Sequence, residues 1–248
     1  MFQRQSGFLN SIPPVTKYIM MANVLLWLAT LALPFELGKY LGLHFAVSDM
    51  FNPAQLVTYM FMHATYDASG GVYIFHIFFN MFALFMFGRV LETVWGQKRF
   101  LIFYLVTGIG AGIVQELAWL YDFREIVFNS NITSIISGEK IFSRNAYFDL
   151  HVTVGASGAV FGILLAFGML FPNAPLLIMF FPVPIKAKYM VILYGVAELF
   201  MGVAGFSGDN VAHFAHLGGM LFGFFLIKYW QRKDRSNRNF NNNGWNFR

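Results

Sequence analysis

The sequence predicts an all-α polytopic membrane protein with six membrane-spanning helices and both chain termini in the cytoplasm. Of its 248 residues, 57% are hydrophobic and only 12% are charged, which is about half the charged fraction of an average soluble domain. The mean hydropathy is +0.57, and several apolar runs approach the roughly 20 residues that a helix needs to cross a bilayer. Such runs are expected to be helical, because lipid offers no partner to an unpaired backbone group.

Six apolar segments follow one another along the chain. They are residues 18–36, 72–94, 98–120, 154–171, 188–206 and 211–230. The first is long enough to span, with a cleavable signal peptide as the alternative. Between the first two, residues 37–71 are amphipathic and rich in aromatic residues and Met, so they are expected to lie in the interface. Residues 121–153 are polar and are expected to form a water-exposed loop.

The basic residues set the orientation. With six crossings, thirteen Lys and Arg fall on the side of the N-terminus and four on the other side, which predicts cytoplasmic termini. This asymmetry accounts for the net charge of +5, so no nucleic-acid partner is expected.

Residues 1–17 form a cytoplasmic segment, 18–230 the six-span domain, and 231–248 a basic, disordered cytoplasmic tail. The lack of cysteine excludes disulfides and thiolate chemistry.

Polar residues inside the spans are the candidates for function, because they are costly in hydrocarbon. At ~1.5 Å per residue, Ser157, His216 and His76 all lie roughly 18–22 Å above the inner boundary, with Asn80 one turn deeper. They come from the fourth, sixth and second spans. Three polar residues from three spans thus share one level, towards the outer face.

Glycines should bring two of these residues together. The fourth span carries Gly158 and Gly162, and the sixth carries Gly219 and Gly223. Both pairs have the G-x-x-x-G spacing that lets helix backbones approach closely in lipid. Packing these faces brings Ser157 near His216, and a serine within reach of a neutral imidazole is an activated nucleophile. The imidazole would take the hydroxyl proton and return it to the leaving group.

The same level offers donors for an oxyanion. Ser157 is expected at the start of its helix, where backbone N–H groups have no intrahelical partner. His76 and Asn80 share one helix face at i, i+4 spacing, and both can donate. No acid falls at the spacing of a third triad member, so the sequence predicts a Ser–His dyad.

The other ionisable residues are assigned structural roles. His213 and His216 are spaced i, i+3, which could suggest a metal pair, but no carboxylate or cysteine is arranged beside them, so no metal and no cofactor are expected. Glu92 could pair with Arg89 one turn away. Glu116 and Glu198 are read as interior hydrogen-bonding residues.

In these residues the chain resembles the rhomboid family of intramembrane serine proteases. The motifs are HIFFN (His76, Asn80), GASG (Gly155, Ser157, Gly158) and AHLGGMLFG (His216, Gly219, Gly223), together with the stretch FGRVLETVWGQKRFLIFYLVTGIGAG after the first of them. Their order, their placement on the second, fourth and sixth spans and the cytoplasmic termini agree with the family. The resemblance covers roughly residues 50–230.

The resemblance implies a six-helix rhomboid-like bundle that hydrolyses transmembrane protein substrates in or near the bilayer. Ser157 would be the nucleophile and His216 the base, while His76, Asn80 and the Ser157 amide would form the oxyanion hole. Family enzymes commonly stack the base on an aromatic ring one turn after the serine, a place that Phe161 holds here. The family's Trp-Arg pair in the first loop corresponds to Ala54-Gln55, a departure that concerns the anchoring of that loop.

Two other functions compete with this interpretation. The first is a catalytically inactive relative that binds membrane clients, against which the intact Ser157 and His216 argue. The second is a small-solute transporter using Glu116 and Glu198, which the lack of an evident duplicated three-span half disfavours.

Hydrolysis also needs water, and residues 63–71 and 205–210 offer polar cover over an outward cavity. The compact six-span core predicts a bacterial inner membrane, with a eukaryotic organelle as the alternative.

Overall fold

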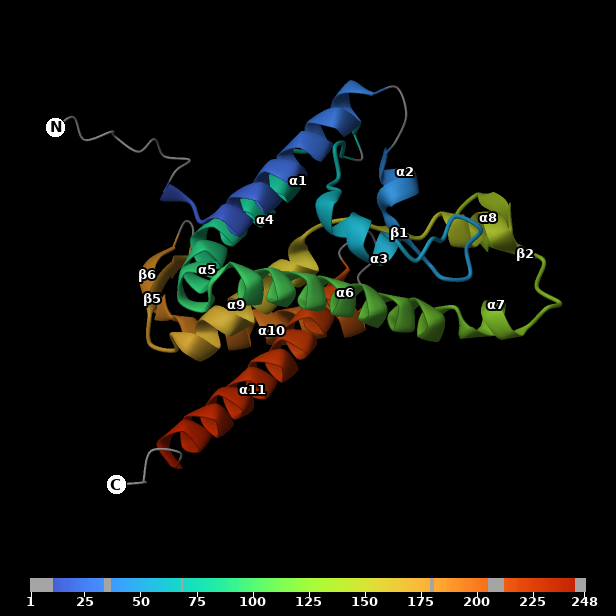
Figure 1. Ribbon diagram of the computed structural model, residues 1–248. Helices are drawn as coiled ribbons and strands as arrows, with labels where there is room; N and C mark the ends of the chain where they lie inside the picture. The colour runs from blue at the N-terminus through green and yellow to red at the C-terminus, as the bar shows by residue number, and fades with distance from the viewer. Residues whose placement is uncertain (1–10, 34–36, 68, 179–180, 205–211, 244–248) are drawn as a thin grey trace.

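The computed structural model describes residues 11–33, 37–67, 69–178, 181–204 and 212–243 as a helical bundle with three small β-pairs (Figure 1). The helices are α1 (Pro14–Ala32), α2 (Leu37–Leu41), α3 (Gln55–Thr58), η2 (Tyr59–Phe61), α4 (Phe75–Ala83), η3 (Leu84–Gly88), α5 (Arg89–Trp95), α6 (Gln97–Asp122), α7 (Arg124–Phe128), α8 (Arg144–Asp149), α9 (Ser157–Leu170), α10 (Ala187–Ala204) and α11 (His213–Asn243). The antiparallel pairs are β1 (Leu43–His44) with β4 (Val152–Thr153), β2 (Ser134–Ser137) with β3 (Lys140–Ser143), and β5 (Pro175–Ile178) with β6 (Phe181–Lys186).

Each of the six predicted spans overlaps one helical stretch. Four stretches among the described residues are long and apolar enough to cross a bilayer, namely α1, Phe75–Trp95, α6 and α10. Phe75–Trp95 runs through α4, the π-helical turn η3 and α5. The apolar helix α9 has only 14 residues, about 21 Å at the α-helical rise. α11 has 31 residues and begins apolar before it turns polar.

The last helix is longer than predicted. α11 continues past residue 230 to Asn243, through much of the segment that was expected to be a disordered tail. A bidentate ion pair ties this extension to the start of α6, because the Arg99 guanidinium donates to both Asp234 carboxylate oxygens, at 3.0 and 2.7 Å. Residues 244–248 lie outside the described part of the chain.

Three helices, α6, α9 and α11, form the packed centre. Small residues let them approach closely: a Cβ atom at Gly219 of α11 would overlap the Gly158 carbonyl of α9. A Cβ at Gly162 would lie 2.7 Å from the Thr107 side chain on α6. The glycine faces of α9 and α11 therefore meet, as the G-x-x-x-G spacing predicts.

The segments 37–71 and 121–153 are more ordered than their sequences suggest. They join through the β1–β4 pair, and α7, α8 and β2 lie together at one end of the molecule, to the right in Figure 1. The first turn of α1, β5, β6 and the last turn of α11 lie at the other end. Phe45 anchors the cap formed by these two segments, with its ring centroid 5.5 Å from that of Phe148 and 6.1 Å from that of Trp119.

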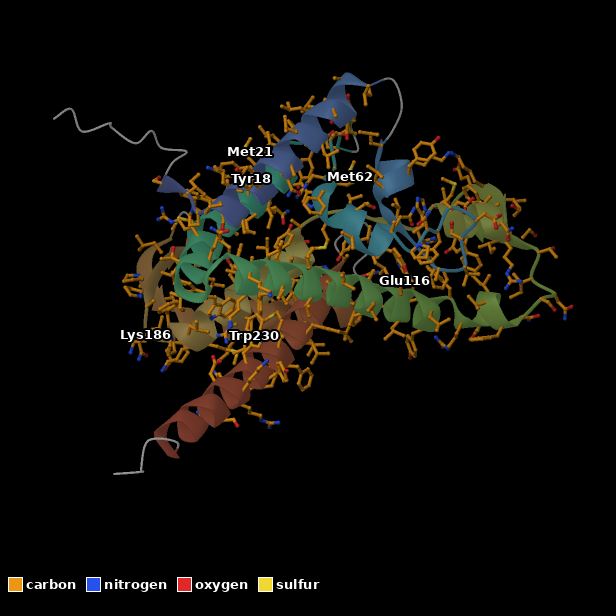
Figure 2. The ribbon with its side chains drawn as sticks, in the orientation of Figure 1. Tyr18, Met21, Met62, Glu116, Lys186 and Trp230 are labelled. Atoms are coloured by element: carbon orange, nitrogen blue, oxygen red, sulfur yellow. The ribbon has the colours of Figure 1, made fainter. Side chains whose placement is uncertain are left out.

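Two acids bind backbone groups. Glu116, on α6 beside the cap (Figure 2), accepts a hydrogen bond of 2.7 Å from the Ala46 N–H. The expected pairing of Glu92 with Arg89 is wrong, because the buried Glu92 carboxylate caps the start of α1. It accepts from the Val15 N–H at 2.9 Å and from both the N–H and the hydroxyl of Thr16 at 2.7 Å. A negative charge at a helix N-terminus satisfies orphan donors and complements the helix dipole.

Candidate active site

Ser157 is the first residue of α9. The chain reaches it through Gly155, whose φ of +135° strains any residue with a side chain. A Cβ atom there would also lie 3.0 Å from His76 Nε2. The Gly155 N–H donates to the Tyr59 carbonyl at 3.0 Å, so the segment 37–71 holds the turn before the serine. The Ser157 N–H thus points out of the first turn of a helix, where it has no intrahelical acceptor.

The structure places the base candidate against this serine. His216 Nε2 lies 2.7 Å from Ser157 Oγ, and His216 is buried, with 7% of its surface exposed. The Phe161 ring, one turn after the serine, stacks on the imidazole with centroids 4.2 Å apart and planes 8° from parallel. Stacking and the serine contact together limit how the imidazole can rotate.

The expectation that no acid reaches the base is wrong. Glu198 on α10 lies beside His216, and its Oε2 is 2.9 Å from His216 Nδ1. The same oxygen is 2.6 Å from Nδ1 of His213. The depth arithmetic that grouped the other polar residues also applies here: Glu198 lies ten residues after Lys188, roughly 15 Å above the inner boundary. That is within one turn of the level of His216, which is the signal that could have found it.

The expectation that no carboxylate is arranged beside His213 and His216 is therefore also wrong. The ligand atoms of these three residues lie within 4.8 Å of one another. However, the two Nδ1–Oε2 separations of 2.6 and 2.9 Å are hydrogen-bond lengths. The geometry is that of a carboxylate accepting two hydrogen bonds.

His76 and Asn80 lie on α4, across from the serine. His76 Nδ1 accepts a hydrogen bond of 3.2 Å from the Ala64 N–H, and the Ala64 carbonyl accepts one of 3.2 Å from the Trp27 indole on α1. Asn80 is buried, and its side-chain amide donates to the His76 carbonyl at 2.9 Å. Its Oδ1 has no hydrogen-bond partner among the described residues.

His63 is a second residue that the sequence did not identify as part of the site. It is 3% exposed, its ring centroid lies 5.0 Å from that of His76, and its Nε2 is 3.5 Å from the Ala156 N–H. Burial, and next the charge that His76 would carry, lower the pKa of His63 to about 3. The imidazole is therefore neutral at physiological pH and packs behind the turn that carries the serine.

A cavity of about 540 Å³ connects these groups. Its lining includes Ser157, His216, His76 and Asn80. Tyr66 and Asp67, from the expected polar cover 63–71, also line it. The other stretch of expected cover, 205–210, lies outside the described residues. The arrangement can hold a carbonyl group between an activated hydroxyl and hydrogen-bond donors, which is the geometry of acyl transfer.

Comparison with known proteins points to one family. The family model described as "Rhomboid domain" matches residues 51–233. The chain is 30% identical over 224 residues to Rhomboid-like protein 11, chloroplastic, of Arabidopsis thaliana, an alignment that covers 83% of this chain and 65% of the relative. It is 31% identical over 157 residues to Rhomboid protein 1, mitochondrial, of Saccharomyces cerevisiae, covering 62% of this chain and 38% of the relative. It is 27% identical over 184 residues to Putative rhomboid protease YdcA of Bacillus subtilis, covering 73% and 69%.

The names of these relatives concern the membrane in which the protein resides. The apolar helices and the matched family identify an integral membrane protein. The plant and yeast relatives are named as chloroplast and mitochondrial proteins, so the comparison does not support a bacterial inner membrane in particular. The chain spans 65% and 38% of the lengths of those two relatives.

Proposed function

Because this chain belongs to the rhomboid family, we propose that it is an intramembrane serine endopeptidase with Ser157 as nucleophile and His216 as general base. The observation that carries the proposal is the 2.7 Å contact between Ser157 Oγ and His216 Nε2 beside a cavity of about 540 Å³. A hydroxyl bonded to an imidazole, with room beside it for a peptide group, is the minimum that peptide hydrolysis by a serine requires.

The reaction follows from the positions of the groups. Ser157 Oγ attacks the carbonyl carbon of the scissile peptide bond while its proton moves to His216 Nε2. The carbonyl oxygen becomes an oxyanion, for which His76, Asn80 and the Ser157 N–H are the proposed donors. When the C–N bond breaks, the proton on Nε2 passes to the leaving amine and an acyl-enzyme forms. Water then attacks this ester with His216 again accepting a proton, which releases the acid and restores Ser157.

The proposed substrates are transmembrane proteins. The family resemblance supports this class, and so does the position of Ser157 and His216 on helices that overlap the predicted fourth and sixth spans. We propose six crossings with both termini in the cytoplasm and a catalytic domain over 18–230. The thirteen-to-four distribution of basic residues supports that orientation. So does the grouping of the first turn of α1, β5, β6 and the last turn of α11 at one end of the molecule (Figure 1).

The test is labelling with a fluorophosphonate, which reacts with activated serines. The purified protein in detergent should form an adduct and cleave a model transmembrane substrate, and both activities should disappear in Ser157→Ala and His216→Ala. Ser130→Ala, which removes an exposed hydroxyl from the 121–153 segment, is the matched control and should behave as the unaltered protein. A folded protein that neither labels at Ser157 nor cleaves would instead support a client-binding scaffold.

A further inference from the structure

We propose that Glu198 is a positioning residue that completes a Ser157–His216–Glu198 triad, an inference that rests on the proposed function. The residues come from three helices, with Ser157 on α9, His216 on α11 and Glu198 on α10. The two contacts that join them are 2.7 Å from Ser157 Oγ to His216 Nε2 and 2.9 Å from His216 Nδ1 to Glu198 Oε2. The imidazole therefore bridges the hydroxyl and the carboxylate through its two different nitrogens.

The carboxylate decides which nitrogen of His216 carries the proton. An ionised carboxylate can only accept hydrogen bonds, so the Nδ1 atom that faces Glu198 must be protonated. In a neutral imidazole the other nitrogen, Nε2, then holds a lone pair, and this is the atom that faces Ser157. Without Glu198 the ring could adopt the opposite tautomer, in which Nε2 is protonated and cannot accept the hydroxyl proton. Glu198 thus keeps His216 in the form that can act as a base.

Glu198 also balances the charge that forms during the attack. Before the attack, an ionised Glu198 lies beside a His216 imidazole that has not yet accepted the hydroxyl proton. When Ser157 gives its proton to His216, the imidazolium formed at Nε2 lies next to a carboxylate. A positive charge of this kind would be costly to bury alone. The imidazolium and the carboxylate then form an ion pair, while a negative charge develops on the substrate oxygen.

The position of the carboxylate is fixed by its surroundings. Glu198 is 7% exposed, and its Oε2 atom is held by two imidazoles, with His213 Nδ1 at 2.6 Å as the second donor. Gly202, one turn later on α10, lets the backbones of α10 and α11 approach, since a Cβ there would lie 3.2 Å from the Cβ of His213. A buried acid with two hydrogen-bonding partners at this spacing is oriented before substrate arrives, as positioning requires.

Kinetic measurements on three variants test the inference. Glu198→Gln keeps the volume and removes the charge, so we expect kcat to fall by at least about 100-fold while KM stays within about twofold, as for the loss of a triad acid. Glu198→Asp restores the carboxylate one methylene further back and should recover part of the lost kcat. Glu116→Gln, which removes an interior carboxylate bonded only to the Ala46 N–H among the described residues, is the matched control and should keep kcat.

The outcomes separate the inference from the proposed function. If Ser157→Ala is inactive while folded Glu198→Gln keeps kcat within about threefold, the triad is wrong and the dyad stands. If Ser157→Ala still cleaves, the proposed function itself fails. Equal loss in Glu198→Asp and Glu198→Gln would indicate only a structural tie between α10 and α11. Loss of activity on incubation with a chelator would indicate a metal ion between Glu198 and the two histidines, and would also overturn the inference.

A spectroscopic measurement needs no substitution at Glu198. In protein with ¹⁵N-labelled histidine, His216 of the resting state should have a protonated Nδ1 and an unprotonated Nε2, assigned by comparison with His216→Gln. A protonated Nε2 in the resting protein would contradict the proposed role of Glu198 even if every variant at that position failed to fold.

Discussion

His216 and His76 face chemically opposite partners at the same ring atom. Nδ1 of His216 lies 2.9 Å from a carboxylate oxygen, whereas Nδ1 of His76 accepts from a backbone N–H at 3.2 Å. A neutral imidazole carries a proton on only one of its two nitrogens. The contact with the carboxylate therefore leaves a lone pair on Nε2 of His216, and the contact with the backbone N–H leaves a proton on Nε2 of His76. One ring is thus prepared to accept a proton and the other to donate a hydrogen bond.

Removing the donor should slow the chemical step. We expect His76→Ala to lower kcat by about 10²–10³-fold, as for the loss of one oxyanion-hole donor, with KM nearly unchanged because the oxyanion exists only after attack. Steady-state cleavage of a model transmembrane substrate measures both constants. His76→Gln keeps an N–H donor and should recover part of kcat. An increase in KM alone would show that His76 binds substrate rather than the oxyanion.

His63 should make stability depend on pH. Its pKa is about 3 in the folded protein against an ordinary value of 6.5, so below pH 6.5 the unfolded chain binds a proton that the folded chain does not. The free energy of unfolding is therefore not reduced by His63 above pH 6.5. It falls as the pH decreases towards 3, by at most about 1.4 kcal/mol per pH unit. Thermal unfolding in detergent between pH 4 and 8 measures this, and His63→Gln should flatten the decrease. An unchanged slope would contradict the assignment.

At the scale of helices, α9 and α11 approach so closely at Gly158 and Gly219 that no side chain fits between the two backbones there. A Cβ at Gly219 would overlap the backbone carbonyl of Gly158, whereas a Cβ at Gly195 of α10 would meet only the flexible end of Met220, at 3.3 Å. The first contact involves rigid backbone and the second a mobile side chain. The 2.7 Å distance between Ser157 Oγ and His216 Nε2 depends on the first of these contacts.

Gly219→Ala and Gly195→Ala therefore form a matched pair. We expect Gly219→Ala to destabilise the protein by about 1–3 kcal/mol through overpacking and to reduce fluorophosphonate labelling of Ser157, because α9 and α11 must separate. Gly195→Ala should leave both the unfolding temperature and the labelling rate close to those of the unaltered protein. If the two variants behave alike, the close approach of α9 and α11 does not depend on the missing side chain at Gly219.

The hydrogen bonds between Glu92 and the start of α1 should matter for the stability of the protein and not for peptide hydrolysis. Glu92 accepts three hydrogen bonds from Val15 and Thr16. We expect Glu92→Gln to lower the free energy of unfolding by about 1.5–3 kcal/mol, as for hydrogen bonds to a charged group, with kcat retained. Glu139→Gln, on the exposed β2–β3 turn, is the control and should change neither quantity. Thermal unfolding and cleavage assays on the same preparations decide between these outcomes.

At the scale of the whole molecule, the proposed orientation places the 121–153 segment and the end of α11 on opposite sides of the bilayer. The chain has no cysteine, so Ser137→Cys and Arg235→Cys each introduce one thiol at an exposed position. A membrane-impermeant thiol reagent added to sealed, right-side-out vesicles should label the first and not the second. Permeabilised vesicles should label both, and the reverse pattern in sealed vesicles would invert the topology.

The sequence predicted the features that depend on one helix or on depth. Apolar run length located the helices, and the spacing of Gly219 and Gly223 identified the face that meets α9. It did not reveal that Glu198 points at His216, because that contact depends on how α10 is rotated against α11, which residue spacing along either helix does not determine. The extension of α11 was missed for a similar reason, since its partner, Arg99, lies far away in the chain.

The contact between Glu198 on α10 and His216 on α11 has a mechanical consequence. The outer face of α10 is exposed, with Ile192, Val196 and Phe200 between 61% and 65% accessible, so in a bilayer this face meets lipid. A hydrogen bond of 2.9 Å is lost after a displacement of only about 1 Å. Lateral pressure or a change in bilayer thickness that shifts α10 would act on the imidazole through a single oxygen atom. The turnover rate of the proposed protease would then report the mechanical state of its membrane.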